Sequence, residues 1–458
     1  MPLGKVASRT MTLDELKAEI AAGDIDTVLL ALTDMQGRLQ GKRLTAPWFL
    51  QSVVGHGAEG CNYLLAVDVD MNTVGGYQMS SWERGYGDFV FRPDLDTLCR
   101  TTWLEGTALC LADVEWEDGS PVVASPRQIL RAQLARLAER GWEAHAGTEL
   151  EFMVFDDSYE QAWDSAYRGL TPANRYNVDY SMLGTARVEP LLRRIRNAMM
   201  DAGMVVEDSK GECNFGQHEI NFLFSDALRA ADNHVIYKNA AKEMAAQDGK
   251  AITFMAKYDE REGNSCHIHL SLRGADGGIV FADDERDGGR SVVFEHFVAG
   301  IQTRMRELTM LYAPNVNSYK RFQPGSFAPT AIAWGTDNRT CALRVVGHGA
   351  GLRVENRVPG GDVNPYLAVA GMLAAGLDGI RGEIPLEPAF EGNAYASDKD
   401  RVPSTLAEAR DLFSASDFAR TALGDEVVDH YAHAADVELA AFNGAVTDWE
   451  RVRGFERL

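Results

Sequence analysis

The sequence lacks the closely spaced cysteine pairs that zinc ribbons and redox motifs use. Its six cysteines are scattered through 458 residues, and a chain of this length does not depend on disulfides for its core. We therefore expect reduced thiols and a cytoplasmic protein. The N-terminus also lacks the apolar core of a signal peptide. The best candidate for a membrane span, residues 367–377, is too short for a bilayer and contains Gly371, so it predicts a buried helix.

Positive charge is also scarce. The 45 lysines and arginines face 67 aspartates and glutamates, which gives a formal net charge of −22. A surface of this sign repels phosphate backbones and anionic lipids, so we expect neither nucleic acid nor a membrane as a partner. The Gly-x-x-x-x-Gly-Lys-Ser/Thr motif of P-loop proteins is absent, so any nucleotide must bind in another way.

The chain is too long for one compact core, and its pattern changes near Ser125-Pro126. Before that point we predict short strands, among them residues 28–34, 38–44 and 63–70. After it, amphipathic helices alternate with strands. Strands that cluster with helices between and after them predict an α+β fold with an antiparallel sheet.

The stretch from Gly147 to Phe155 is the most informative in the chain. Apolar and aromatic residues dominate it, which predicts a strand. Side chains alternate in a strand, so Glu149 and Glu151 share one face, about 7 Å apart, while Leu150 points into a core. Two carboxylates held together on an apolar strand repel each other and lose hydration. A solvated strand face is the ordinary explanation of one such pair, and bound cations are the other.

Three further segments carry polar pairs of the same kind. They contain His267 and His269, Glu355 and Arg357, and the looser pair Glu212 and Glu219. Four such segments in or beside apolar strands are hard to reconcile with solvated surface charge, because buried carboxylates need cations. Oxygen ligands with an imidazole favour Mg²⁺ or Mn²⁺ over zinc.

Five arginines gather in one part of this acidic chain: Arg321, Arg339, Arg344, Arg353 and Arg357. Surface ion pairs would explain any one of them. Guanidinium groups bind carboxylate and phosphate in a fork. Divalent cations together with arginines are typical of phosphoryl transfer, so the combined pattern predicts a phosphoryl-transfer enzyme.

Taken in order, the motifs resemble the glutamine synthetase family in its bacterial type I form. Besides Glu149-Leu-Glu151 and His267-Ile-His269-Leu-Ser271, they are Gly216-Gln217-His218-Glu219, Asn317-Ser-Tyr-Lys-Arg321, Asn338-Arg339, Glu355-Asn-Arg357 and Asn364-Pro-Tyr366. The resemblance runs from about residue 12 to the end of the chain.

The resemblance implies a small N-terminal β-grasp domain and a large C-terminal catalytic domain with a curved antiparallel sheet. We place a flexible tail at residues 1–10, the β-grasp domain at 11–105 and the catalytic domain at 106–458. It also implies a homo-oligomer, a dodecamer of two stacked hexameric rings, with active sites between neighbouring subunits.

The resemblance further implies roles for individual residues. Two or more Mg²⁺ or Mn²⁺ ions would be held by Glu151, Glu212 and Glu219 and by Glu149, His267 and Glu355. ATP would contact Glu207, His269, Ser271, Arg344 and Arg353. Glutamate would be bound by Gly263, Arg321 and Arg357, and the transferring phosphate by Arg339. Asp70, or its neighbour Asp68, would reach the amine pocket of an adjacent subunit.

The chain departs from glutamine synthetases at the flap over the active site. The family's flap carries a glutamate that shields the acyl phosphate and helps to deprotonate ammonium, and Phe327 stands in its place here. Phe327 can neither accept a proton nor bind ammonium by charge. The segment around the family's regulatory tyrosine is represented only by Asn393-Ala-Tyr395, which leaves open whether Tyr395 is modified.

These features predict an ATP-dependent ligase that joins the γ-carboxylate of glutamate to a small primary amine through γ-glutamyl phosphate. The resemblance suggests synthetases of γ-glutamylethanolamide or γ-glutamylpolyamines as relatives, and leaves the choice of amine open. One alternative is ordinary glutamate–ammonia ligase, against which Phe327 argues. The other is a non-catalytic structural oligomer, against which the complete set of six metal ligands argues.

Overall fold

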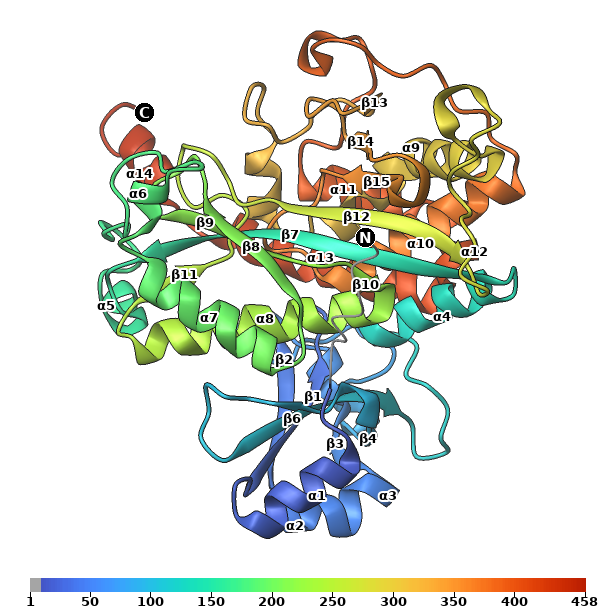
Figure 1. The fold of residues 1–458 in the computed structure, drawn as a ribbon. Coiled ribbons are helices and arrows are strands. Elements are labelled where there is room, and N and C mark those ends of the chain that lie inside the picture. The colour runs from blue at the N-terminus through green and yellow to red at the C-terminus, as the bar shows by residue number, and fades with distance from the viewer. Residues whose placement is uncertain (1–9) are drawn as a thin grey trace.

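The described residues, 10–458, form two β-sheets with helices packed around them in a computed structural model (Figure 1). The predicted tail over residues 1–10 lies outside this range except for Thr10. The predicted α+β fold, with a small N-terminal sheet and a larger C-terminal sheet, is confirmed.

The first sheet has six strands in the order β2-β1-β6-β4-β3, with β5 paired to β6. The strands are β1 (Thr27–Thr33), β2 (Leu39–Thr45), β3 (Ala58–Cys61), β4 (Asp88–Pro93), β5 (Cys99–Arg100) and β6 (Thr107–Glu115). The hairpin of β1 and β2 is antiparallel, whereas β1 and β6 run parallel. Helix α1 (Leu13–Ala22) begins at a capping box of Thr12 and Glu15, as the sequence predicts. The predicted domain boundary at residue 105 stays a prediction; β6, which follows it, belongs to this first sheet.

The strand predicted at residues 63–70 is wrong. A 3₁₀ helix covers Asn62–Leu65, and the chain then turns at Asp68. The Asp68 carboxylate accepts a hydrogen bond of 2.8 Å from the backbone N–H of Asn72, which closes this turn. The apolar pattern favoured a strand, but a local side-chain bond to the backbone replaces the ladder.

The second sheet has nine strands, and its long central strand is β7 (Trp142–Phe155). The others are β8 (Val206–Gly211), β9 (Gln217–Phe222), β10 (Ser225–Asp226), β11 (Ala251–Thr253), β12 (Cys266–Gly274), β13 (Trp334–Thr336), β14 (Leu343–Val346) and β15 (Arg353–Asn356). Their order is β13-β14-β15-β12-β7-β9-β8. The pairing of β13 with β14 is parallel, so the sheet is mixed where the sequence predicted an antiparallel one.

Helices cover one face of the second sheet. In Figure 1, α7 and α8 lie below the long strands β7, β8 and β9. The long helices are α4 (Pro126–Ala138), α7 (Glu189–Asp201), α8 (Ala227–Gln247), α9 (Val292–Tyr312), α10 (Pro365–Arg381) and α13 (Asp425–Gly444). The shorter ones are α2 (Ala46–Trp48), α3 (Val54–His56), α5 (Tyr159–Asp164), α6 (Met182–Thr185), α11 (Leu406–Ser414), α12 (Asp417–Leu423) and α14 (Asp448–Gly454). Over residues 10–458, no helix combines the length and the apolar character needed to cross a bilayer.

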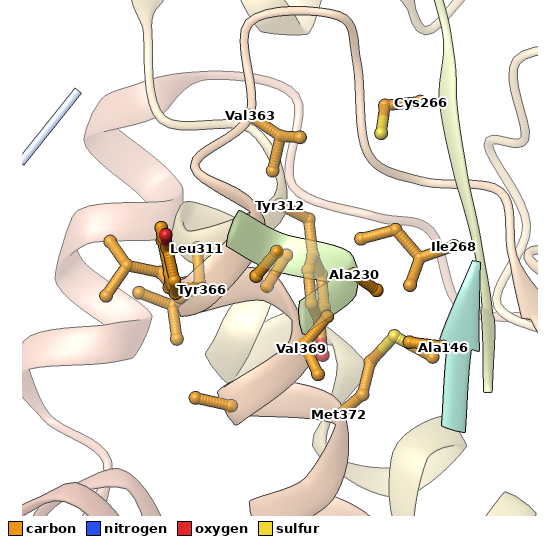
Figure 2. Packing of buried hydrophobic residues seen from close by; sticks show 14 of the residues in the cluster. Ala146, Ala230, Cys266, Ile268, Leu311, Tyr312, Val363, Tyr366, Val369 and Met372 are labelled. Carbon is orange, nitrogen blue, oxygen red and sulfur yellow. The ribbon is translucent and has the colours of Figure 1, made fainter. Parts of the chain in front are cut away.

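The core lies between the second sheet and its helices. Figure 2 shows Ala146 and Ile268, from neighbouring strands, facing Val369 and Met372 of α10. Helix α10 is buried along most of its length, as the apolar run in the sequence predicts. Because one face of the strands meets these helices, the alternate side chains must point to the other face.

Arg127 joins the two sheets. This buried side chain, in the first turn of α4, donates hydrogen bonds of 2.7 Å to both Asp94 and Asp113 beside the first sheet. Its Nε also donates to Asp232 of α8, under the second sheet, over 2.9 Å. One guanidinium therefore bridges the small sheet and the large core.

Candidate active site

The strand register brings the predicted ligands together on the face of the second sheet opposite the helices. Glu149 of β7 lies across from His267 of β12, and Glu151 lies across from Glu219 of β9. On the next strand, Glu355 of β15 lies across from His269. The alternation along each strand and the register between the strands thus bring these side chains into one patch.

Three glutamates form one group within this patch. The carboxylate oxygens of Glu151, Glu212 and Glu219 lie within 4.8 Å of one another. Glu151 accepts hydrogen bonds from the backbone N–H of Ser265 at 2.7 Å and from Gln217 at 3.0 Å. These bonds aim the Glu151 carboxylate toward its two neighbours.

Burial and mutual repulsion make this group costly to ionise. Burial, followed by the charge of Glu212, raises the pKa of Glu151 from 4.5 to about 8. For the same two reasons, burial and then a neighbouring carboxylate, the pKa of Glu219 rises to about 8 and that of Glu212 to about 7. A divalent cation would relieve both causes, so these oxygens fit an ion such as Mg²⁺ or Mn²⁺.

The second group is built around Glu149. Its Oε2 lies 3.1 Å from Nδ1 of His267, and its Oε1 lies 2.8 Å from Nε2 of His269. Nδ1 of His267 is also 3.5 Å from Glu355. Burial opposes ionisation of Glu149, but the hydrogen bonds to both imidazoles outweigh it and lower the pKa of this carboxyl.

The two histidines differ in whether their second ring nitrogen has a hydrogen-bond partner. Nδ1 of His269 accepts a hydrogen bond of 3.2 Å from Arg353, so both of its nitrogens are in use. Nε2 of His267 is buried without a hydrogen-bond partner among the described residues. Burial and the nearby Arg357 lower the pKa of His267 to about 4, which leaves its imidazole neutral. A neutral imidazole is the form that binds metals. Ligand atoms of Glu149, His269 and Glu355 lie within 4.8 Å of one another, so this group also fits a cation.

The predicted arginines separate into distinct positions. Arg344 donates to Glu355 over 3.0 Å, and Arg357 also pairs with Glu355. Arg321 is buried and donates to the carbonyl of Val358 at 2.8 Å. Arg339 is exposed on the wall of the cavity described next. Of these four, Arg321 is the one that does not line that cavity.

Two adjoining cavities meet at the ligand patch. The first encloses about 490 Å³, and all three members of the three-glutamate group line it. Its wall includes Glu151, Glu219, Gly263, Phe327, Arg339 and Arg357. The second encloses about 380 Å³. Glu149, Asp208 and Asn221 line both cavities, so the two spaces share one wall.

Four of the five residues predicted to contact ATP line the second cavity: Glu207, His269, Ser271 and Arg353. The fifth, Arg344, lines the first cavity instead. Phe224, which packs against His145 with ring centroids 5.8 Å apart, is also on this wall and is 55% exposed. An exposed aromatic ring beside basic groups suits a nucleobase. Sequence reasoning did not single out Phe224.

The loop that carries Phe327 lines the first cavity. Phe327 is 57% exposed and has a positive φ of 57°, which is strained for a bulky residue. The next residue, Ala328, is held by a hydrogen bond of 2.9 Å from the hydroxyl of Tyr395. Gly263, across the cavity wall, cannot be larger, because a Cβ there would lie 2.2 Å from the carbonyl oxygen of Ala256.

Asp70 is not part of either cavity in its own chain. It lies within the turn that Asp68 and Asn72 close, next to Met71 with its positive φ of 65°. The carboxylate of Asp68 is used within this loop by Asn72. The predicted contribution of Asp70 to a neighbouring subunit stays a prediction.

Lys210 is the residue of the patch that the sequence did not single out. It lies on β8 directly across from Glu219 and lines the first cavity. Its ammonium pairs with Glu212 and lies over the ring of Tyr180, 4.9 Å from the centroid. The strand-like spacing of Lys210 and Glu212 was a signal, but a single lysine beside a glutamate is common on surfaces.

Comparison with known proteins identifies the class of protein to which this fold and this ligand patch belong. The chain belongs to the glutamine synthetase family, because residues 123–453 match the family model described as glutamine synthetase, catalytic domain. Among its relatives is the γ-glutamylethanolamide synthetase GlnA4 of Streptomyces coelicolor, to which it is 65% identical over 99% of this chain and 98% of that one.

Two further relatives bear on the site. The chain is 37% identical to a glutamate–isopropylamine ligase of a Pseudomonas species, over 94% of this chain and 95% of that one. A solved structure described as a GmaS/ADP complex superimposes with a TM-score of 0.85 and 27% identity, over 96% of this chain and 99% of that one. The predicted family is therefore confirmed.

Proposed function

We propose that this protein is an ATP-dependent glutamate–amine ligase whose preferred acceptor is a small alkylamine, ethanolamine before polyamines. The observation that carries the choice of amine is Phe327, an exposed aromatic side chain on the wall of the first cavity. The similarity to a γ-glutamylethanolamide synthetase and to a glutamate–isopropylamine ligase supports the same choice.

The reaction consists of two displacements. The γ-carboxylate of glutamate attacks the terminal phosphorus of ATP and forms γ-glutamyl phosphate, with ADP as the leaving group. The amine nitrogen then attacks the acyl carbon, the C–O bond to phosphate breaks, and phosphate leaves with its electron pair. The proton lost by the amine must pass to a base, and Glu262 on the cavity wall is the carboxylate we assign to this task.

We assign the residues as follows. Glu151, Glu212 and Glu219 would hold one divalent cation, and Glu149, His267 and Glu355 another, whether Mg²⁺ or Mn²⁺; when bound, these ions supply charge neutralisation for the phosphoryl group. The second cavity would hold ATP through Glu207, His269, Ser271 and Arg353. Arg357, Arg339 and Arg344 would face glutamate and the transferring phosphate with fixed positive charge. Arg321 would act indirectly, because its bonds to the carbonyls of Val358 and Arg357 and to the hydroxyl of Ser265 fix the segment that carries Arg357.

Phe327 changes what the acceptor site can bind. A carboxylate at this position would bind ammonium by charge and take its proton, and the phenyl ring does neither. The ring instead offers apolar area to a carbon chain, at roughly 25 cal/mol per Å² buried. A few tens of Å² favour an alkylamine by about 1 kcal/mol, which is less than a tenfold preference, and loss of the ammonium-binding charge adds to it.

The amine is tested by ATP-dependent phosphate release with glutamate and one acceptor at a time. The acceptors are ammonium, ethanolamine, isopropylamine, putrescine and spermine, with omission of glutamate as the control and mass spectrometry of the γ-glutamyl product. We expect the highest kcat/KM with ethanolamine. If kcat/KM is highest with ammonium, the protein is an ordinary glutamate–ammonia ligase. If no amine causes phosphate release, the protein is a non-catalytic oligomer.

We further propose a cytoplasmic dodecamer of two hexameric rings in which Asp70 completes the site of a neighbouring subunit. Asp70 lies outside both cavities of its own chain, which a shared site would explain. Mixing inactive Asp70→Ala subunits with inactive Glu151→Ala subunits should restore part of the activity, because some mixed interfaces are intact. A monomer by light scattering, or no recovery in verified mixed oligomers, would refute the shared site.

A further inference from the structure

Lys210 occupies an unusual place for a lysine. Its ammonium pairs with Glu212 and lies 3.7 Å from Glu219, so it lies among the carboxylates assigned above to a divalent cation. The pair is not a surface contact, because the side chains of Lys210, Glu212 and Glu219 are 21%, 13% and 4% exposed. The backbone pairing of Lys210 with Glu219 across β8 and β9 fixes this position.

The charges of the three glutamates explain why the ammonium of Lys210 lies among them in the metal-free protein. Three ionised carboxylates in one partly buried group would repel each other strongly. The ammonium of Lys210, which pairs with Glu212 and lies 3.7 Å from Glu219, supplies a positive charge that offsets this repulsion. A lysine is a compact charge on a flexible stem, unlike an arginine, and it can leave one partner for another.

The ammonium has a second contact in its present position. The ring of Tyr180 lies 4.9 Å from Nζ of Lys210 and lines the first cavity. An aromatic face holds an ammonium through its negative electrostatic potential. Lys210 can therefore give up Glu212 without losing every favourable contact.

We propose that Lys210 is an internal counter-cation of the three-glutamate group, which the divalent ion displaces from Glu212 when it binds. Lys210 is then a positioning residue that acts through Glu212 and Glu219. It keeps the metal-free site folded and weakens the metal's affinity, so that the ion is held exchangeably rather than permanently. This inference rests on the metal assignment of the proposed function.

The proposal predicts opposite effects on stability and on metal affinity when the charge is removed. In the metal-free protein, Lys210→Met should lower Tm by several degrees, because the glutamates lose their counter-charge. The same variant should bind Mn²⁺ about tenfold more tightly at pH 8, because a cation no longer competes for Glu212. A residue with a merely structural role would weaken metal binding when removed, and would not tighten it.

The experiment uses the full-length protein treated with a chelator, with Tm from differential scanning fluorimetry and Mn²⁺ affinity from calorimetry and electron paramagnetic resonance. Lys210→Arg, which keeps the charge, should retain the Tm of the wild type, and Lys210→Gln replaces the Met variant if that one is not recovered. Lys250→Met is the matched control, because Lys250 pairs with Asp156 on the surface and lines neither cavity.

The outcomes separate the two claims. If Glu151→Ala leaves Mn²⁺ binding unchanged, the metal assignment falls and the role of Lys210 falls with it. If Glu151→Ala removes a Mn²⁺ site while Lys210→Met binds Mn²⁺ as the wild type does, or more weakly, only the role of Lys210 is overturned. Tighter Mn²⁺ binding together with a lower metal-free Tm supports it.

Discussion

At the scale of single residues, the three-glutamate group links the stability of the protein to pH. The pKa of Glu151 is raised from 4.5 to about 8 in the folded protein, and Glu212 and Glu219 behave in the same way. Between pH 4.5 and about pH 8, the folded state therefore holds protons that the unfolded chain has already released. Stability falls as pH rises wherever the folded state binds more protons.

We expect the metal-free protein to lose thermal stability as pH rises from 6.5 to 8. His267 acts in the other direction, because burial lowers its pKa to about 4, but its contribution changes mainly below pH 6.5. Glu149 and Glu355, whose pKa values are lowered, lose their contribution only in acid. The measurement is Tm in chelator across this range, with Glu151→Gln expected to flatten the slope. Saturating Mg²⁺ should reverse the trend, because it binds the ionised carboxylates.

Phe327→Glu tests the acceptor site at one side chain. The new carboxylate would face the first cavity and would supply both a charge for ammonium and a base. We expect kcat/KM for ammonium to rise at least severalfold and that for ethanolamine to fall. Phe327→Leu serves as the matched control, because it keeps apolar area without the charge. If the glutamate variant gains nothing with ammonium, the ring merely packs the loop.

At the scale of elements, alternation along strands made the site predictable. Because side chains repeat every two residues, Glu149 and Glu151, or His267 and His269, could be assigned to one face from the sequence alone. Which strands lie next to one another could not be derived this way, and came from the family resemblance. The same alternation failed at residues 63–70, where a bond from Asn72 to Asp68 turns the chain.

Lys210 shows a different limit of sequence reasoning. Its importance arises from Glu219, which lies nine residues away but directly across the ladder between β8 and β9. A lysine next to a glutamate in an acidic chain gives no sign of such a partner. The mixed character of the second sheet could not be predicted for a similar reason. The parallel pairing of β13 and β14 depends on the path of the chain between them rather than on strand composition.

The flap is an element whose position depends on few contacts. The hydroxyl of Tyr395 donates to the carbonyl of Ala328, next to the strained Phe327. Tyr395→Phe removes this one bond, which is worth about 1 kcal/mol. We expect kcat/KM to fall about threefold to tenfold with Tm nearly unchanged, because the loop opens while the core stays packed. A large loss of Tm would mean that Tyr395 supports the fold rather than the flap.

At the scale of the whole molecule, Arg127 couples the two sheets. Arg127→Met leaves Asp232 buried with one hydrogen-bond partner among residues 10–458, the hydroxyl of Tyr366 at 2.6 Å. We expect a loss of about 3 kcal/mol in the free energy of unfolding, because an uncompensated buried charge is costly. Hydrogen exchange should increase first in β6 and its neighbours.

Arg131→Met is the control for this coupling. Arg131 pairs with the same Asp94 and Asp113 but is 37% exposed, so its loss should cost less than about 1 kcal/mol. Equal effects of the two variants would mean that the bridge to Asp232 contributes nothing.

The wall shared by the two cavities also has a pharmacological consequence. Glu149, Asp208 and Asn221 line both spaces, so the two spaces adjoin each other at these side chains. A single compound could therefore extend from one space into the other, with an adenine-like group near Phe224 and an alkyl tail against Phe327. Linking two weak fragments in this way raises their joint affinity, because the second fragment is already confined near its own site once the first has bound. The alkyl end would distinguish this protein from enzymes that carry a glutamate at the flap, which makes selectivity a property of one end of the inhibitor.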